Sequence, residues 1–239
     1  MKKTKNKQVI NSKFPLDKIA PFKFARLASY FSDGSRPGRK MGSALALKKS
    51  VVAVGRNSFT RTHTIQGNGV KPFIPMNCLS DNSMVITSHE MREGNSGSKF
   101  KNGDTLFARI TPCLENGKTG FVQFLPNEAT IAFGSTEFIV LRSKSLSSEI
   151  VYLLSRTNSF RDNAIKSMSG ATGRQRVKES CFDSYLFAHP NKEIILSFTE
   201  LVSPMFREIF VLQQKNANLR TTRDFLLPKL ISGEIDVSS

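Results

Sequence analysis

The stretch from Phe198 to Leu226 reads FTELVSPMFREIFVLQQKNANLRTTRDFL. Mostly apolar residues recur along it at alternating steps of four and three, a heptad spacing that predicts one long helix able to pair with another. The predicted interface residues are Phe198, Val202, Met205, Ile209, Leu212, Asn216 and Leu219. We expect Pro228 or Gly233 to end the helix. The alternative is an amphipathic helix on the core of its own domain, although its length exceeds what one small domain usually covers.

The chain ahead of this helix is β-weighted up to about residue 140. Short runs rich in Val, Ile, Phe and Thr, bounded by Gly, Pro, Asn or Ser, predict strands. The predicted strands are 50–54, 72–75, 84–87, 104–110, 120–124, 136–141 and a closing strand at 185–190. Helices are predicted at 24–31, at 147–156 capped by Ser147, and at 158–168 capped by Asn158. The expected fold is α/β of the α+β type, with a β-weighted globular domain followed by a long coiled-coil-type helix.

The charge of the chain points to an anionic partner. Lys and Arg number 35 against 19 Asp and Glu, a formal net charge of +16, and nucleic acid is the first candidate for so basic a protein. Residues 1–60 hold 14 of the basic and 2 of the acidic residues. The basic start of the chain is equally consistent with a solvated tail, so it does not establish a DNA site by itself.

A second basic segment, residues 166–178, reads KSMSGATGRQRVK and contains no acidic residue. Glycine lets backbone N–H groups approach phosphates, Ser and Thr donate to them, and Arg174 or Gln175 suits the edge of guanine or adenine. Composition alone leaves open the alternative of a solvated basic loop.

Several kinds of chemistry lack their signatures. No Asp or Glu has Lys two positions later, as the common metal-dependent nucleases require, and the chain has neither an N-P-P-[YF] nor an H-E-x-x-H run. Pro112–Thr119 ends like a phosphate-binding loop, but proline replaces its first glycine and a predicted strand follows. We interpret it as a turn with Lys118 and Thr119 exposed at the tip.

The cysteines and the hydropathy suggest a cytoplasmic protein. Cys78, Cys113 and Cys181 are too far apart to predict a disulfide framework or a zinc pair. No apolar run approaches the length of a membrane span, and the basic start is not followed by the apolar core of a signal peptide. No membrane contact is expected.

Five short motifs, in order along the chain, resemble the landmarks of type I restriction–modification specificity subunits. They are Gly103–Ile110 (GDTLFARI), Gly117–Gly120 (GKTG), Ala132–Thr136 (AFGST), Ser167–Thr172 (SMSGAT) and Leu219–Glu234 (LRTTRDFLLPKLISGE). The last is the most specific. The resemblance spans about residues 24–239 and implies a DNA target-recognition domain followed by a conserved helix.

The resemblance also implies partners. Such subunits bind double-stranded DNA and dock methyltransferase (modification) subunits on their helices, and a motor-nuclease (restriction) subunit joins the complex. S-adenosylmethionine, ATP and Mg²⁺ belong to those partners, so we expect no cofactor and no catalysis in this chain. We divide it into a basic flexible lead-in (1–20), a target-recognition domain (21–190) and a helix for dimerisation and docking (191–239).

The expected DNA-contacting residues come from the basic segments and the motifs. They are Arg36, Lys40, Arg109, Lys118, Thr119, Ser135, Thr136, Lys166, Ser169, Gly170, Thr172, Arg174, Gln175 and Arg176.

The chain departs from the family pattern in having one domain and one helix instead of two of each. It is either a natural half-subunit that pairs with a copy of itself or the C-terminal half of a longer protein. Two functions of other classes remain open from the residues alone. These are a free-standing DNA enzyme, such as a nuclease with an unrecognised site, and a helix-mediated scaffold or antitoxin-like partner.

Overall fold

The computed structural model describes residues 69–171, 173–185, 187 and 189–235. The described elements, in chain order, are β1 (Lys71–Ile74), η2 (Met76–Cys78), β2 (Glu90–Arg92), β3 (Ser98–Phe100), β4 (Thr105–Ala108), β5 (Thr119–Phe121), β6 (Ala132–Gly134), β7 (Phe138–Leu141), α3 (Ser148–Ser155), α4 (Asn158–Lys166), η3 (Glu179–Ser184) and α5 (Lys192–Ile231). The mixed strands followed by a long helix confirm the expected α+β class.

The strands form two sheets. The first has the order β2-β1-β6-β3, in which only β1 and β6 are parallel. The second has the order β5-β4-β7 and is antiparallel throughout, with Leu106 opposite Val140 and Phe107 opposite Ile139. The Ser98 hydroxyl donates to the Phe138 carbonyl across 2.8 Å, which ties the two sheets together.

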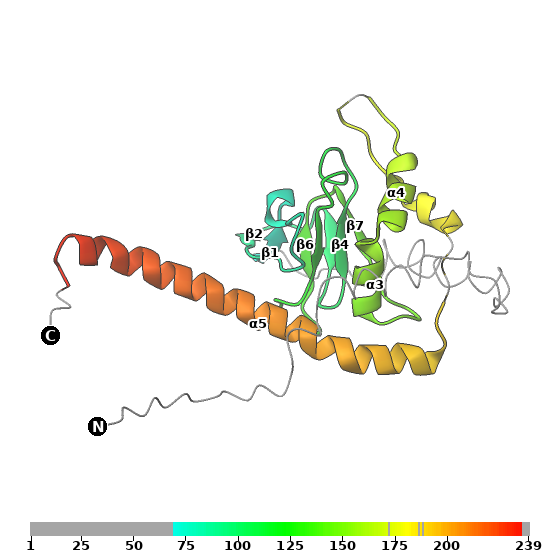
Figure 1. Ribbon diagram of the computed structural model, residues 1–239. Helices are drawn as coiled ribbons and strands as arrows, with labels where there is room; N and C mark the ends of the chain where they lie inside the picture. Colours follow the sequence, from blue (N-terminus) through cyan, green and yellow to red (C-terminus); the bar gives the residue numbers. More distant parts are fainter. Residues whose placement is uncertain (1–68, 172, 186, 188, 236–239) are drawn as a thin grey trace, which may run out of the picture.

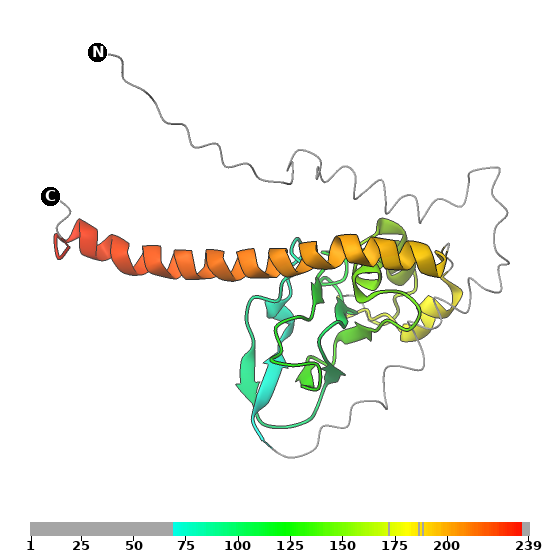
Figure 2. The same ribbon diagram turned by 90° about the horizontal axis from the view of Figure 1, so that it is seen from below.

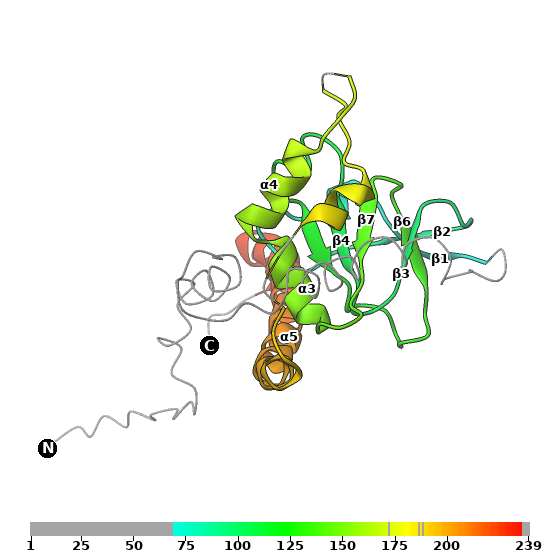
Figure 3. The ribbon, with the colours of Figure 1, turned by 90° about the vertical axis from the view of Figure 1, so that its right-hand side faces the viewer.

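The second sheet is covered on both faces, as Figure 3 shows, with helices α3 and α4 on one side and the first sheet on the other. Successive strand residues point to opposite faces, so Leu106 packs with Phe100 and Val140 between the sheets. Phe107 and Ile139 point the other way, into a core shared with the helices. This explains why every residue of β4 and β7 is buried.

The motif Gly103–Ile110 contains a buried ion pair at the start of β4. Asp104 is 1% exposed, and its carboxylate accepts hydrogen bonds from Arg142 Nε at 2.7 Å and Nη2 at 2.5 Å. The Lys101 amide donates to the same carboxylate. A charge removed from water is tolerated only when it is paired in this way, so the aspartate of the motif has a structural role.

Helix α5 crosses the globular part with its first half and extends beyond it with its second half (Figures 1 and 2). Phe206 of α5 packs edge-on against Phe121 of β5 and Tyr152 of α3, with ring centroids 5.1 and 5.7 Å away. Val202 lies in the same cluster. Burial raises the pKa of Tyr152 to about 12, despite the opposing effect of Arg156, so the ring stays neutral in this contact.

The helices match the prediction closely at their starts. Ser147 caps α3 by accepting a hydrogen bond from the Ile150 amide. Asn158 was the wrong cap for α4, because Thr157 accepts from the Phe160 amide and Asn158 is already the first helical residue.

Helix α5 ends near Gly233 and not at Pro228, which were the two predicted ends. The helix passes Pro228 and ends at Ile231, before Gly233. The helix continues through Pro228, although proline has no N–H to donate to the Asp224 carbonyl. The helix is exposed there, so water can solvate that carbonyl instead.

The strand predictions were partly wrong. Residues 84–87 form only an isolated bridge from Val85 to Phe121. None of the described residues of 185–190 is in a strand; Tyr185 and Phe187 instead fill the core that includes Phe160. Strands β2, β3 and β6 were not predicted. All three strands are only three residues long, which is too short to show a recognisable apolar period.

The helix predicted at 24–31, the strand at 50–54 and the lead-in at 1–20 lie outside the described residues.

We predict that Gly134→Ala destabilises the protein, because a Cβ there would lie 2.7 Å from the Ile74 carbonyl oxygen and 3.0 Å from the Phe138 ring. Overpacking of this kind costs about 1–3 kcal/mol, measurable as a lower midpoint in urea. Gly69→Ala is the matched control, since nothing lies within 4 Å of its Cβ position. Equal midpoints for the two variants would contradict the packing described for β6.

Candidate nucleic-acid interface

Residues 169–171 and 173–176 form the two arms of a hairpin that projects from the globular part next to α4 (Figure 1). The Ser169 and Arg176 backbones exchange two hydrogen bonds of 3.1 and 2.9 Å, and the Arg174 amide donates to the Ala171 carbonyl at 3.0 Å. Gly170 and Gly173 adopt φ values of +127° and +81°, which other residues rarely adopt. The glycines of the basic segment therefore shape a tight turn.

The base of the hairpin is joined to the end of strand β4. The Thr111 amide donates to the Gln175 carbonyl at 3.1 Å, and the Val177 amide donates to the Arg109 carbonyl at 2.8 Å. Val177 is fully buried in the core beneath. The hairpin thus has a fixed base and an exposed tip.

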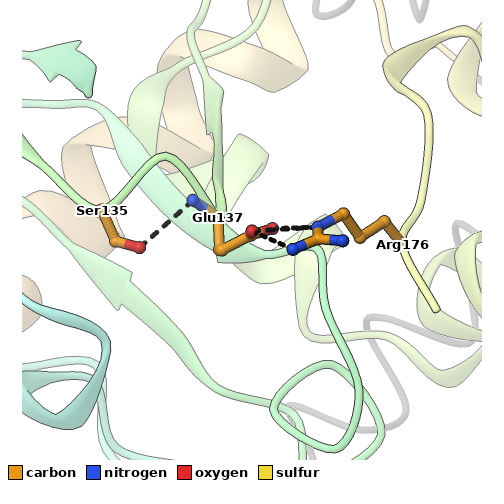
Figure 4. Close-up of polar contacts among 3 residues, drawn as sticks. All are labelled: Ser135, Glu137 and Arg176. Carbon is orange, nitrogen blue, oxygen red and sulfur yellow. Dashed lines mark hydrogen bonds and ion pairs between the residues drawn. The ribbon is translucent and has the colours of Figure 1, made fainter. Parts of the chain in front are cut away.

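An ion pair also joins the hairpin to the sheet (Figure 4). Arg176 donates to the Glu137 carboxylate from Nε at 2.9 and 3.0 Å and from Nη2 at 2.8 Å. The side chains are 47% and 23% exposed. The hydrogen bond to Glu137 raises the pKa of Arg176 above its usual value.

The structure brings several of the predicted DNA-contacting residues together on this hairpin. The exposed members there and at the end of α4 are Lys166, Ser169, Gly170, Arg174 and Arg176, with Gln175 half-buried. Ser135, Thr136 and Arg109 lie near its base. Ser135 and Thr136 directly precede Glu137 in the sequence, and the Arg109 amide donates to the Glu137 carbonyl. Arg36, Lys40 and Thr172 lie outside the described residues.

The turn at Pro112–Thr119 differs from the expectation in one respect. It leads into strand β5, as predicted, but its end is not an exposed tip. Thr119 is 1% exposed because it pairs with Phe107 in the second sheet, and Lys118 extends back to the Met76 carbonyl at 3.5 Å. Thr119 is therefore not available to DNA in this structure.

The predicted helix interface is divided by the fold. Phe198 and Val202 pack on the globular part, and Phe206 and Phe210 continue that contact at steps of four. The predicted heptad seam takes a step of three to Met205, so it diverges from the docked face. Its later members Ile209, Leu212, Asn216 and Leu219 are exposed.

Further apolar residues extend this exposed face toward the end of α5. They are Leu226, Leu227, Leu230 and Ile231, each at least 37% exposed. Together with Ile209, Leu212 and Leu219 we call them the distal face of α5. A run of this length is more than single apolar residues scattered on a surface.

Sequence comparison identifies relatives for this architecture. The chain is 31% identical over 141 residues to the specificity subunit of the type I restriction enzyme EcoAI of Escherichia coli, and 31% identical over 140 residues to that of EcoEI. The matched regions cover 55% and 54% of this chain. The chain is similar to type I restriction specificity subunits. It spans about a quarter of their length, 24% and 23%. No protein-family model matches the chain.

The fold of a type I specificity subunit also resembles this one. The crystal structure of the HsdS subunit from Thermoanaerobacter tengcongensis superposes with a TM-score of 0.51 and 15% identity, over 80% of this chain and 49% of that one. The likeness to a specificity subunit therefore extends to the arrangement of the elements.

The resemblance to specificity subunits rests on motifs that the fold uses. Gly103–Ile110 contains β4 and its buried aspartate, and Ala132–Thr136 contains β6. Glu137 was not predicted as part of this site, because an acidic residue gives no signal of DNA contact in a sequence. Its position directly after the Ala132–Thr136 motif was the available signal.

Two absences concern the described residues alone. No group of three His, Cys, Asp or Glu side chains there is arranged to hold a metal ion. No helix among them combines the length and apolar character of a membrane span.

We predict that Phe206→Ala and Leu219→Ala differ strongly in stability. Removing the buried Phe206 ring should cost about 3–5 kcal/mol, whereas truncating the exposed Leu219 should change the free energy of unfolding by no more than about 0.5 kcal/mol. Urea denaturation at low protein concentration measures both. A stable Phe206→Ala variant would show that α5 does not depend on the ring cluster.

Proposed function

We propose that this chain is a non-catalytic specificity subunit that recognises a duplex DNA sequence and directs type I methyltransferase and endonuclease subunits to it. The observation that carries the proposal is the 31% identity to two type I specificity subunits over more than half of the chain. The lack of nuclease and methyltransferase motifs in the sequence supports the assignment of catalysis to the partners, together with their S-adenosylmethionine, ATP and Mg²⁺. Because the complex would act on DNA, we expect the chain to be cytoplasmic.

The hairpin supports DNA contact. Lys166, Arg174, Arg176 and Lys178 lie on or beside it and are exposed, and the sequence between them contains no acidic residue. An exposed basic hairpin on a rigid base can enter a groove or follow the phosphates without cost to the core. In this proposal residues 21–190 are the target-recognition domain.

The distal face of α5 supports the contact with proteins. From Phe206 to Ile231 the helix extends for about 38 Å at 1.5 Å per residue. Apolar side chains on it are covered best by another helix. We propose that residues 191–239 pair with a second copy or a second half-subunit and dock the methyltransferase subunit, with the restriction subunit joining through that complex.

Two-fold pairing through the distal face would give the complex two recognition domains. A symmetric pair of domains reads an inverted repeat, because the symmetry of the protein is mirrored in the DNA. Asn216, at an a-type position of the seam, would favour one register of the paired helices.

We predict that Lys166→Ala and Arg174→Ala weaken duplex binding by the complex with its cognate methyltransferase subunit. Each lost phosphate contact should lower the slope of log affinity against log salt by about 0.9. Lys144→Ala is the control, because Lys144 is exposed at the opposite end of β7 from the hairpin. Mobility shifts at several salt concentrations measure the slopes, and unchanged slopes in both hairpin variants would remove this segment from the DNA site.

We predict that Leu212→Asp with Leu219→Asp prevents assembly without unfolding the chain, since both positions are exposed and two carboxylates in an apolar interface lose hydration. Sedimentation of the chain and co-purification with the methyltransferase subunit measure the loss. Gln214→Asp with Thr221→Asp adds the same charge on the opposite side of the helix and should assemble normally. If both double variants behave alike, the distal face is not the contact.

A further inference from the structure

Arg176 differs from the other basic residues on and beside the hairpin in having an acidic partner, Glu137. Lys166 and Arg174 have no acidic partner among the described residues, whereas Arg176 donates three hydrogen bonds to one carboxylate. A paired arginine adds little net attraction for phosphates, because the carboxylate cancels its charge. The pair therefore needs an explanation other than affinity for the DNA backbone.

Glu137 is itself held in place. The Ser135 hydroxyl accepts from the Glu137 amide at 3.1 Å (Figure 4), the Glu137 carbonyl accepts from the Arg109 amide at 3.0 Å, and the buried strand β7 begins at the next residue. The carboxylate thus projects from a rigid point of the second sheet. A partner bound to it has a defined position relative to the core.

The contact with Glu137 occupies one edge of the Arg176 guanidinium and leaves the other edge without a hydrogen-bond partner among the described residues. Nε and Nη2 face the carboxylate, so Nη1 and the outer hydrogen of Nη2 form a fork directed away from it. No acceptor for Nη1 occurs among the described residues. Because the guanidinium is planar, a carboxylate on one edge fixes the direction of the other. A fork of this kind matches the O6 and N7 acceptors of guanine.

We propose that Arg176 is a specificity-determining residue that reads guanine, and that Glu137 is the residue that positions it. This inference rests on the proposed function, and it replaces a phosphate role for Arg176 with recognition of a base. The unpaired Lys166 and Arg174 then supply attraction to the backbone, so affinity and selectivity reside in different residues of one hairpin.

The test compares two substitutions that change the net charge equally. Glu137→Gln and Glu128→Gln each remove one carboxylate, but Glu128 is exposed in the loop between β5 and β6. Electrostatics alone predicts tighter DNA binding for both. Arg176→Lys keeps the charge and removes the planar fork. The probes are a duplex that the wild-type complex with its methyltransferase subunit enriches from a randomised library, and the same duplex with its sequence scrambled.

We expect Glu137→Gln and Arg176→Lys to lower the ratio of affinities for the selected and scrambled duplexes by roughly tenfold, whereas Glu128→Gln keeps the wild-type ratio. In libraries selected anew, both variants should lose a guanine preference that the wild type shows. Equal ratios for Glu137→Gln and Glu128→Gln would overturn the proposal, and so would a selected site without guanine preference.

Two measurements separate this proposal from other failures. If the wild-type complex enriches no sequence, the proposed recognition function is wrong. If it enriches a sequence but Glu137→Gln has no effect on the affinity ratio, only the proposal for Arg176 and Glu137 is wrong. Hydrogen exchange of the Ser169 and Arg176 amides, measured without DNA, reports whether the backbone pairing of the hairpin is intact. Wild-type protection in Glu137→Gln supports positioning of the guanidinium, whereas lost protection would show that Glu137 holds the backbone and would overturn its stated role.

Discussion

The contact among Phe121, Tyr152 and Phe206 is the constraint on which the arrangement of this molecule depends. Three edge-on rings, from β5, α3 and α5, meet with centroids 5.1–5.9 Å apart, and such pairs add to the energy of simple burial. The cluster fixes the long helix to the second sheet, which also supports the hairpin through the end of β4. The direction of the helix and the place of the hairpin therefore share one rigid support.

The two-sided burial of β4 and β7 makes that support stiff. Leu106 and Val140 pack toward the first sheet and Phe107 and Ile139 toward the helices, so neither strand can shift by one residue without exchanging its two buried faces. Two of the motifs that resemble specificity subunits, Gly103–Ile110 and Gly117–Gly120, contribute to β4 and β5 of this support, and Leu219–Glu234 begins within α5.

Much of this was predictable from the sequence, and the misses have physical causes. The heptad spacing predicted α5, and Ser147 predicted the start of α3, because local periodicity and capping depend on neighbouring residues. The division of the seam between a docked half and an exposed half depends on Phe121 and Tyr152, which are far away in sequence. The bond between Arg176 and Glu137 joins residues 39 positions apart, and local patterns do not report such pairs.

The tip of the hairpin has a consequence for how the protein can change. Ala171 and Arg174 lie beyond the last backbone pairing at Ser169 and Arg176, and neither belongs to the buried core. Substitutions at these two positions carry little penalty in folding, whereas Gly170 and Gly173 are fixed by positive φ values that other residues rarely adopt. Side chains at the tip can therefore change without compensating changes in the core, as long as the two glycines that shape the turn are kept.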